Sequence, residues 1–67
     1  METVKVIELI GISKKSWEDA ANNAVLEATK TLDNITGLEV VAQTAKVENN
    51  KIASFRTNVK VAFVVKE

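Results

Sequence analysis

The stretch that most constrains the fold is Lys51–Lys66, in which the two sets of alternate residues differ in polarity. From Ala53 to Val65, six of the seven odd-numbered residues are apolar, whereas the even-numbered set contains Ser54, Arg56, Asn58 and Lys60. Side chains alternate between the faces of a strand, so this period of two predicts one strand with one face against a core. Its 16 residues would extend about 50 Å, far beyond a typical strand of about 5–6 residues. The polar face is therefore either solvated or turned towards other copies of the chain.

The small size of the chain points to self-association. Its 67 residues make a single domain, 1–67, and a core of this size rarely supplies more than about 3–5 kcal/mol without further support. The chain has no Cys and no His, which excludes disulfides and the usual zinc sites. Hydrophobic residues nevertheless make up 46% of the sequence. We therefore expect the chain to form a homo-oligomer.

Charge and hydropathy argue against two classes of partner. Nine basic and nine acidic residues cancel and are interspersed, so the chain lacks the concentrated basic patch that nucleic-acid binding usually needs. The apolar run Val4–Ile12 is interrupted by Lys5 and Glu8, is too short to span a bilayer and lacks the layout of a signal peptide. We therefore expect no nucleic-acid partner, no membrane partner and a cytoplasmic location.

A first strand is predicted at Thr3–Ile10. Its apolar residues divide between the two faces, with Val4, Val6 and Ile10 on one and Ile7 and Leu9 on the other. Strands with two apolar faces are typically buried on both sides, and a lone chain offers only one core. Gly11 is expected to end this strand in a turn.

A helix is predicted at Trp17–Asp33. Ser16 precedes Glu18 and Asp19, an arrangement that caps a helix start and places acids at its positive end. One stripe at helical spacing is rich in Ala, which would let a sheet approach closely; it comprises Trp17, Ala20, Ala21, Ala24, Ala28, Thr31, Leu32 and Ile35. Trp17 is interpreted as a packing anchor rather than as a residue that stacks on a ligand.

A second strand, Leu38–Glu48, is predicted to pair with Lys51–Lys66 through a hairpin turn at Asn49-Asn50, because Asn tolerates positive φ. A continuous register pairs Glu39 with Lys60, Val41 with Asn58, Gln43 with Arg56, and Gly37 with Ala62. The apolar side of the last strand would then be extended by Leu38, Val40, Ala42 and Thr44. A bulge would shift this register.

The predicted elements follow the order β-α-β-β. A right-handed crossover would leave the first two strands parallel with a gap between them, which the long third strand fills. We therefore expect an α+β fold, in which a three-stranded antiparallel sheet of order 1-3-2 wraps around one helix.

Four segments of the sequence together resemble the dodecins: VKVIELIGISKKSWEDAANNAVLEA, TLDNI, LEVV and VKVAF. The resemblance covers nearly the whole chain. It implies a hollow spherical homododecamer in cubic symmetry, with the helices facing outward and the curved sheets lining the inside. Such a shell would account for both the overlong last strand and the doubly apolar first strand. Many dodecins bind flavins such as riboflavin and FMN, and are thought to store or sequester them.

The resemblance also identifies two ligand positions, and both are substituted in this sequence. In flavin-binding dodecins an aromatic residue, usually Trp, lies two residues before the Glu of the second strand and stacks on the flavin ring; here that residue is Gly37. The family's Gln on the last strand, which hydrogen-bonds the flavin's polar edge, is Arg56. We therefore expect a member of the branch without the stacking Trp, with weak flavin binding. Further contacts on the inner wall are expected from Glu39, Val41, Gln43, Asn58 and Lys60.

Calcium is the alternative ligand, because one branch of relatives without the aromatic residue is associated with it. Glu39, Asn58 and Asp33 could supply oxygen ligands only if symmetry brings copies together, so no metal site is assigned within one chain. A purely structural or interaction shell is also open. Catalysis is not expected, because the chain has no His, Cys or Tyr. Glu18 and Asp19 are better explained as acids at a helix start than as a catalytic pair.

Overall fold

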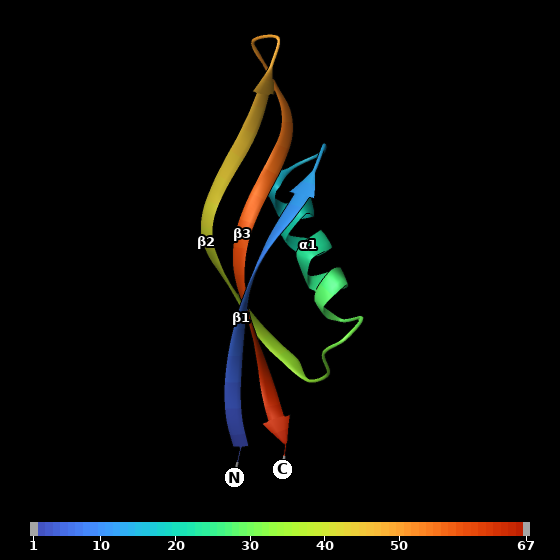
Figure 1. The fold of residues 1–67 in the computed structure, drawn as a ribbon, viewed down its shortest axis with the longest axis vertical. Coiled ribbons are helices and arrows are strands. Elements are labelled where there is room, and N and C mark those ends of the chain that lie inside the picture. Colours follow the sequence, from blue (N-terminus) through green and yellow to red (C-terminus); the bar gives the residue numbers. More distant parts are fainter. Residues whose placement is uncertain (1, 67) are drawn as a thin grey trace.

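The computed structural model describes residues 2–66, which form three strands and one helix (Figure 1). The elements are β1 (Glu2–Ser13), α1 (Trp17–Ala28), β2 (Ile35–Glu48) and β3 (Lys51–Lys66). Both β1 and β2 pair with β3 in antiparallel fashion, which gives the sheet order β1-β3-β2. The predicted α+β fold and strand order are confirmed. The bounds of β3 are those expected from its alternation, and the molecule is 52 Å along its longest axis.

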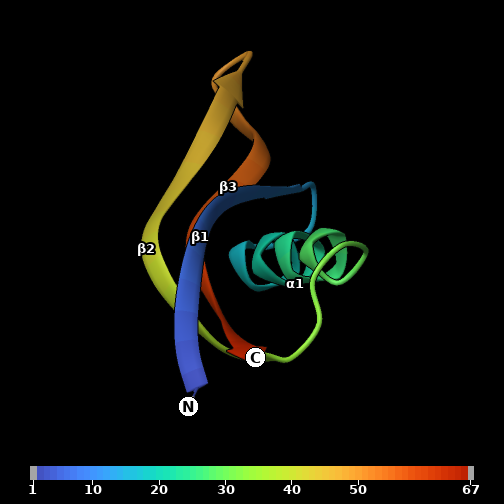
Figure 2. The same ribbon diagram turned by 60° about the horizontal axis from the view of Figure 1, so that its bottom comes forward.

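The sheet curves around α1, which lies on its concave side (Figure 2). Three small residues of the helix, Ala20, Ala24 and Ala28, are buried where it meets the sheet. On the sheet side, Val59 and Val61 of β3 are fully buried. Ile7, Leu9, Ala21 and Ile35 pack around this cluster. The part of the predicted Ala-rich stripe that lies within α1 therefore faces the core and lets the helix lie close to the strands, whereas Thr31, Leu32 and Ile35 of that stripe lie outside the helix.

The start of α1 is fixed by its cap and by Trp17. The Ser16 hydroxyl accepts a hydrogen bond from the Asp19 amide at 2.9 Å, which confirms the predicted cap. The Trp17 ring lies edge-on to Phe55, with centroids 4.8 Å apart. Its Nε1 donates to the Thr44 carbonyl oxygen at 2.8 Å. Trp17 thus anchors the helix start to both β2 and β3, as expected of a packing anchor.

The helix is shorter than predicted, because it ends at Ala28 rather than Asp33. Thr29 caps it, with its hydroxyl donating to the Leu26 carbonyl oxygen at 2.6 Å, and a turn follows. The chain then reverses at Asn34, whose φ of 62° is left-handed. The Asn34 carbonyl oxygen already accepts from the Val64 amide, so β2 begins at Ile35 instead of Leu38. No helix within residues 2–66 has the length and apolarity needed to cross a lipid bilayer.

Gly11 does not end β1, and this prediction is wrong. The strand continues to Ser13, and Gly11 pairs with Thr57 of β3. A Cβ at Gly11 would lie 1.8 Å from the Ala20 carbonyl oxygen, so the residue must be Gly for the helix to cross the strand at this point. The Gly at this position therefore reflects the close approach of the β1 and α1 backbones and not a turn.

Candidate functional site

The sheet face that points away from α1, called the open face below, carries most of the polar side chains of β3. Thr57, Val59 and Val61 are buried on the helix side, so the intervening residues of β3 lie on the open face. Arg56 and Lys60 are exposed there, and Asn58 is half-buried between them. This confirms the predicted division of β3 into an apolar face and a polar face.

Charged residues cross the open face in one row, formed by Glu8 of β1, Lys60 of β3 and Glu39 of β2. The predicted pairing of Glu39 with Lys60 is confirmed. Among residues 2–66, however, the only ion pair within 4.0 Å joins Lys30 and Glu27 on the helix. Lys60 therefore contributes charge to the face rather than a closed salt bridge, and pairs of this exposed kind are worth about 0–1 kcal/mol.

Asn58 occupies the middle of the open face. Its Nδ2 donates to Glu8 Oε2 at 2.9 Å, while its Oδ1 is buried and has no hydrogen-bond partner within residues 2–66. A buried acceptor left unpaired costs about 1–3 kcal/mol. Because this oxygen is buried, a ligand or another copy of the chain can pair with it only if the Asn58 side chain rotates towards the open face.

The predicted pairs Val41–Asn58 and Gln43–Arg56 are wrong, because β2 has a bulge at Val41. The register shifts between Val40 and Ala42, so Asn58 faces Ala42 and Arg56 faces Thr44. Gln43 pairs with Thr57 on the helix side instead. The same shift moves Ala42 and Thr44 onto the open face, while Leu38 and Val40 stay on the helix side opposite Val61 and Val59. The extra residue in β2 therefore reverses, for the residues after Val41, which side chains point to the helix side and which to the open face.

Gly37 and Arg56 lie on the same face, as predicted, but one chain does not bring them together. Gly37 pairs with Ala62, six residues along β3 from Arg56. At about 3.3 Å per residue they are about 20 Å apart. A ligand that touches both positions must therefore be held by more than one copy of the chain.

Gly37 does not need the conformational freedom of Gly. Its φ is not positive, and among the described residues a Cβ built on it meets only the Ala62 Cβ, at 4.0 Å. The strand can therefore carry a larger side chain at this position.

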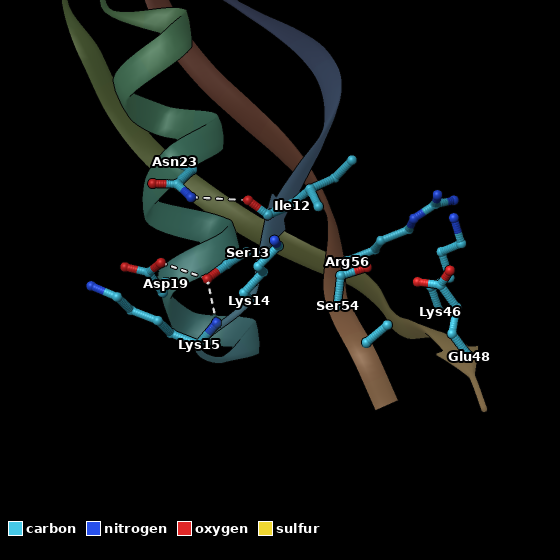
Figure 3. A pocket seen from close by; sticks show the side chains of 11 residues that line it. Ile12, Ser13, Lys14, Lys15, Asp19, Asn23, Lys46, Glu48, Ser54 and Arg56 are labelled. Atoms are coloured by element: carbon cyan, nitrogen blue, oxygen red, sulfur yellow. Dashed lines mark hydrogen bonds between the residues drawn. The ribbon is translucent and has the colours of Figure 1, made fainter. Parts of the chain in front are cut away.

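A cavity that the sequence did not reveal lies where β1 ends against the β2–β3 hairpin (Figure 3). It has a volume of about 630 Å³. Arg56 is the only predicted site residue among those that line it; the remainder are Ile12, Ser13, Lys14, Lys15, Asp19, Asn23, Lys46, Glu48, Ala53 and Ser54. In a continuous register Lys46 would fall on the helix side, so the Val41 bulge is what places it beside this cavity.

The predicted calcium ligands do not converge within one chain. Glu39 and Asn58 share the open face, whereas Asp33 lies in the loop before β2. Residues 2–66 contain no group of three or more acidic side chains placed to hold a metal ion.

Comparison with known proteins identifies relatives that span the whole chain. The dodecin family model matches residues 3–66. The chain is 36% identical over 63 residues to the calcium dodecin of Mycobacterium tuberculosis, which covers 94% of this chain and 89% of that protein.

Solved structures give the same result for the fold. The dodecin from Streptomyces davaonensis superposes with a TM-score of 0.94 at 29% identity, covering 98% of this chain and 97% of that one. The structure of the Mycobacterium tuberculosis calcium dodecin, described as calcium chelating with a novel calcium-binding site, has a TM-score of 0.84 at 34% identity and covers 96% and 91% of the two chains. Because the family model spans almost all of the described residues, the chain belongs to the dodecin family.

Proposed function

We propose that twelve copies of this chain form a closed, hollow shell that binds small molecules and has no catalytic role. The observation that carries the proposal is a row of exposed apolar side chains on the open face of β1. Val4, Val6, Ile10 and Ile12 are 53–61% exposed, whereas the buried apolar residues of the chain are only Ala20, Ala24, Ala28, Val59 and Val61 within residues 2–66. Membership of the dodecin family supports twelve as the number of copies.

Burial of this row would add stability that the small core lacks. A fully buried aliphatic side chain is worth about 1.5–3 kcal/mol, so covering four half-exposed ones contributes about 3–6 kcal/mol per chain. This is comparable to the stability expected of a core of this size. The shell and the folded chain are therefore expected to depend on one another.

Ile10→Lys should disrupt the shell, because it places a charge in the middle of the apolar row. Leu26→Lys is a matched control, since Leu26 on α1 is 63% exposed and Ile10 is 61% exposed. In the proposed shell the helices face outward, so the helix variant keeps the size of the unmodified protein. Size-exclusion chromatography with light scattering compares the two. If both variants keep the size of the unmodified protein, the β1 row is not an interface.

We propose that this shell binds flavin only weakly. Gly37 has no ring to stack on the isoalloxazine, and stacking of one aromatic ring is worth about 1–3 kcal/mol by analogy with base–aromatic contacts. Arg56 donates hydrogen bonds but cannot accept them, whereas the amide of a Gln does both. FMN is expected to bind better than riboflavin, because Arg56 and Lys60 put positive charge on the same open face.

Calcium is the second candidate ligand, favoured by the 36% identity to a relative named calcium dodecin. Calcium takes six to eight oxygen ligands, more than residues 2–66 of one chain bring together. The proposed site would therefore lie between copies, with Glu39 and Asn58 of the open face as its candidate ligands.

Titration of the unmodified protein separates these ligands. We expect a colourless preparation, weak quenching of flavin fluorescence and a smaller Kd for FMN than for riboflavin. Calorimetry with calcium chloride, with magnesium chloride as control, tests the alternative. A yellow preparation that binds riboflavin tightly would contradict the proposal of weak flavin binding. Saturable calcium binding that magnesium does not compete with would favour the second candidate.

A further inference from the structure

The β2–β3 hairpin extends beyond the end of β1, and the cavity of Figure 3, called the arm cavity below, lies at the base of this extension (Figures 1 and 3). The last pair between β1 and β3 is Ser13 with Phe55, so Ile12 and Arg56 are the final open-face pair that includes β1. Lys46 and Ser54 are paired on β2 and β3 one step further out. The arm cavity therefore lies where the three-stranded part of the sheet ends and the two-stranded β2–β3 hairpin continues alone.

Two cationic side chains, Lys46 and Arg56, are neighbours at the edge of this cavity. Lys46 is opposite Ser54, and Arg56 is opposite Thr44, which makes Lys46 and Arg56 diagonal neighbours on one face. Diagonal neighbours lie about 7–8 Å apart at the backbone, within reach of long side chains. The ends of both side chains gather on the same side of the cavity in Figure 3, whereas Lys15 points the other way.

Neither carboxylate at the cavity forms an ion pair with Lys46 or Arg56. Asp19 Oδ2 accepts a hydrogen bond from the Ser13 hydroxyl at 2.6 Å, so this carboxylate is held at the helix start. Glu48 lies near Lys46 and Arg56 in Figure 3, but no carboxylate in residues 2–66 is within 4.0 Å of either cation. The lining carries four cationic and two anionic side chains, in a protein whose net charge is zero.

We propose that the arm cavity binds a phosphate dianion, either free or as the phosphomonoester of a small organic molecule. The Arg56 guanidinium offers a planar fork of N–H donors, Lys46 adds a second positive charge, and the Ser54 hydroxyl can donate a hydrogen bond. Donors of this kind suit an anion with several oxygens. Ala53, which also lines the cavity, supplies a small apolar surface for the organic part of an ester.

This site shares Arg56 with the proposed flavin position but does not depend on flavin or calcium binding. The distinction follows from the distance along β3, because Ala62, the partner of Gly37, lies six residues from Arg56, whereas Lys46 is a diagonal neighbour of Arg56. A protein that binds no flavin at all would therefore still bind phosphate here.

Calorimetry of the flavin-free, unmodified protein with sodium phosphate and with phenyl phosphate, at low ionic strength in chloride buffer, tests the proposal. We expect saturable binding of both that weakens as salt is added. Tighter binding of phenyl phosphate identifies an ester as the preferred form, and equal affinities identify the free anion. Absence of saturable binding of either compound would overturn the proposal.

Variants then locate the site. Arg56→Gln and Lys46→Gln should each raise the Kd about tenfold or more, because each removes a charge-assisted hydrogen bond. Glu48→Gln should lower the Kd severalfold by removing a repelling charge. Lys30→Gln is the control and should leave the Kd unchanged, because Lys30 is exposed and lies outside the lining of the arm cavity. If Lys30→Gln weakens binding as much as Arg56→Gln does, the affinity reflects general surface charge and the site is wrong.

Discussion

The double variant Gly37→Trp, Arg56→Gln is expected to bind riboflavin strongly where the unmodified protein binds it weakly. The Trp ring supplies the missing stacking surface, and the Gln amide can both donate to and accept from the flavin's polar edge. If two copies contribute to each pocket, stacking adds about 2–6 kcal/mol, which lowers the Kd by a factor of about 30 to 20,000. Quenching of riboflavin fluorescence on titration measures the gain.

The structure supports the feasibility of this variant at Gly37. The backbone there has no positive φ, and within residues 2–66 a new Cβ would meet only the Ala62 Cβ, at 4.0 Å. The Trp side chain can therefore extend over the open face without strain in the strand. Gly37→Leu with Arg56→Gln is a control of apolar bulk without a ring. Equal, weak binding by the Leu and Trp variants would show that the ring does not stack at this position.

Gly11→Ala is expected to be the most destabilising single substitution of a small residue in this protein. The added Cβ would lie 1.8 Å from the Ala20 carbonyl oxygen and 2.8 Å from its carbonyl carbon. Both atoms belong to the helix backbone, so no side-chain rotation relieves the contact and α1 must move away from the sheet. We expect a loss of about 3 kcal/mol or more in the free energy of unfolding, or loss of the folded protein altogether.

Gly37→Ala is the matched control for Gly11→Ala, because both glycines lie within strands. The control should be neutral or stabilise the protein by about 0.4–1 kcal/mol, since Ala restricts the unfolded chain and fits the native backbone. Urea unfolding of all three proteins at one protein concentration measures the difference. Similar midpoints for the two variants would mean that α1 does not cross β1 at Gly11.

The strands were predictable where one face is clearly polar. In β3 the buried Thr57, Val59 and Val61 alternate with Arg56, Asn58 and Lys60, so both the strand and its orientation follow from the sequence. The hairpin turn was also predictable, because Asn tolerates positive φ. Asn49 and Asn50 adopt positive φ values of 52° and 64°. Both features depend on local chemistry that a single sequence displays directly.

The register of β2 was not predictable beyond Val40, for a physical reason. Val40, Val41 and Ala42 are consecutive apolar residues, so either face of the strand can take either set without burying a charge. A bulge among these residues leaves no signal in the local sequence. It nevertheless places Thr44, rather than Gln43, opposite Arg56. The arm cavity was missed for the same reason, because the position of Lys46 depends on this bulge.

Two other errors arose where tertiary packing overrides a local signal. Gly11 resembled a turn residue, but it accommodates the crossing of α1 over β1. The helical pattern continued to Asp33, but the helix ends at Ala28, and β2 already pairs with β3 from Ile35. Neither the crossing point nor the pairing is encoded within a window of neighbouring residues.

The central claim is that the apolar row of β1 is covered by other copies in a closed shell of twelve chains. Native mass spectrometry of the unmodified protein at micromolar concentration tests this claim most directly. Twelve copies of 7.3 kDa predict one dominant species of about 88 kDa. A spectrum that contains only monomer or dimer would contradict the account, and would leave Val4, Val6, Ile10 and Ile12 exposed without a partner.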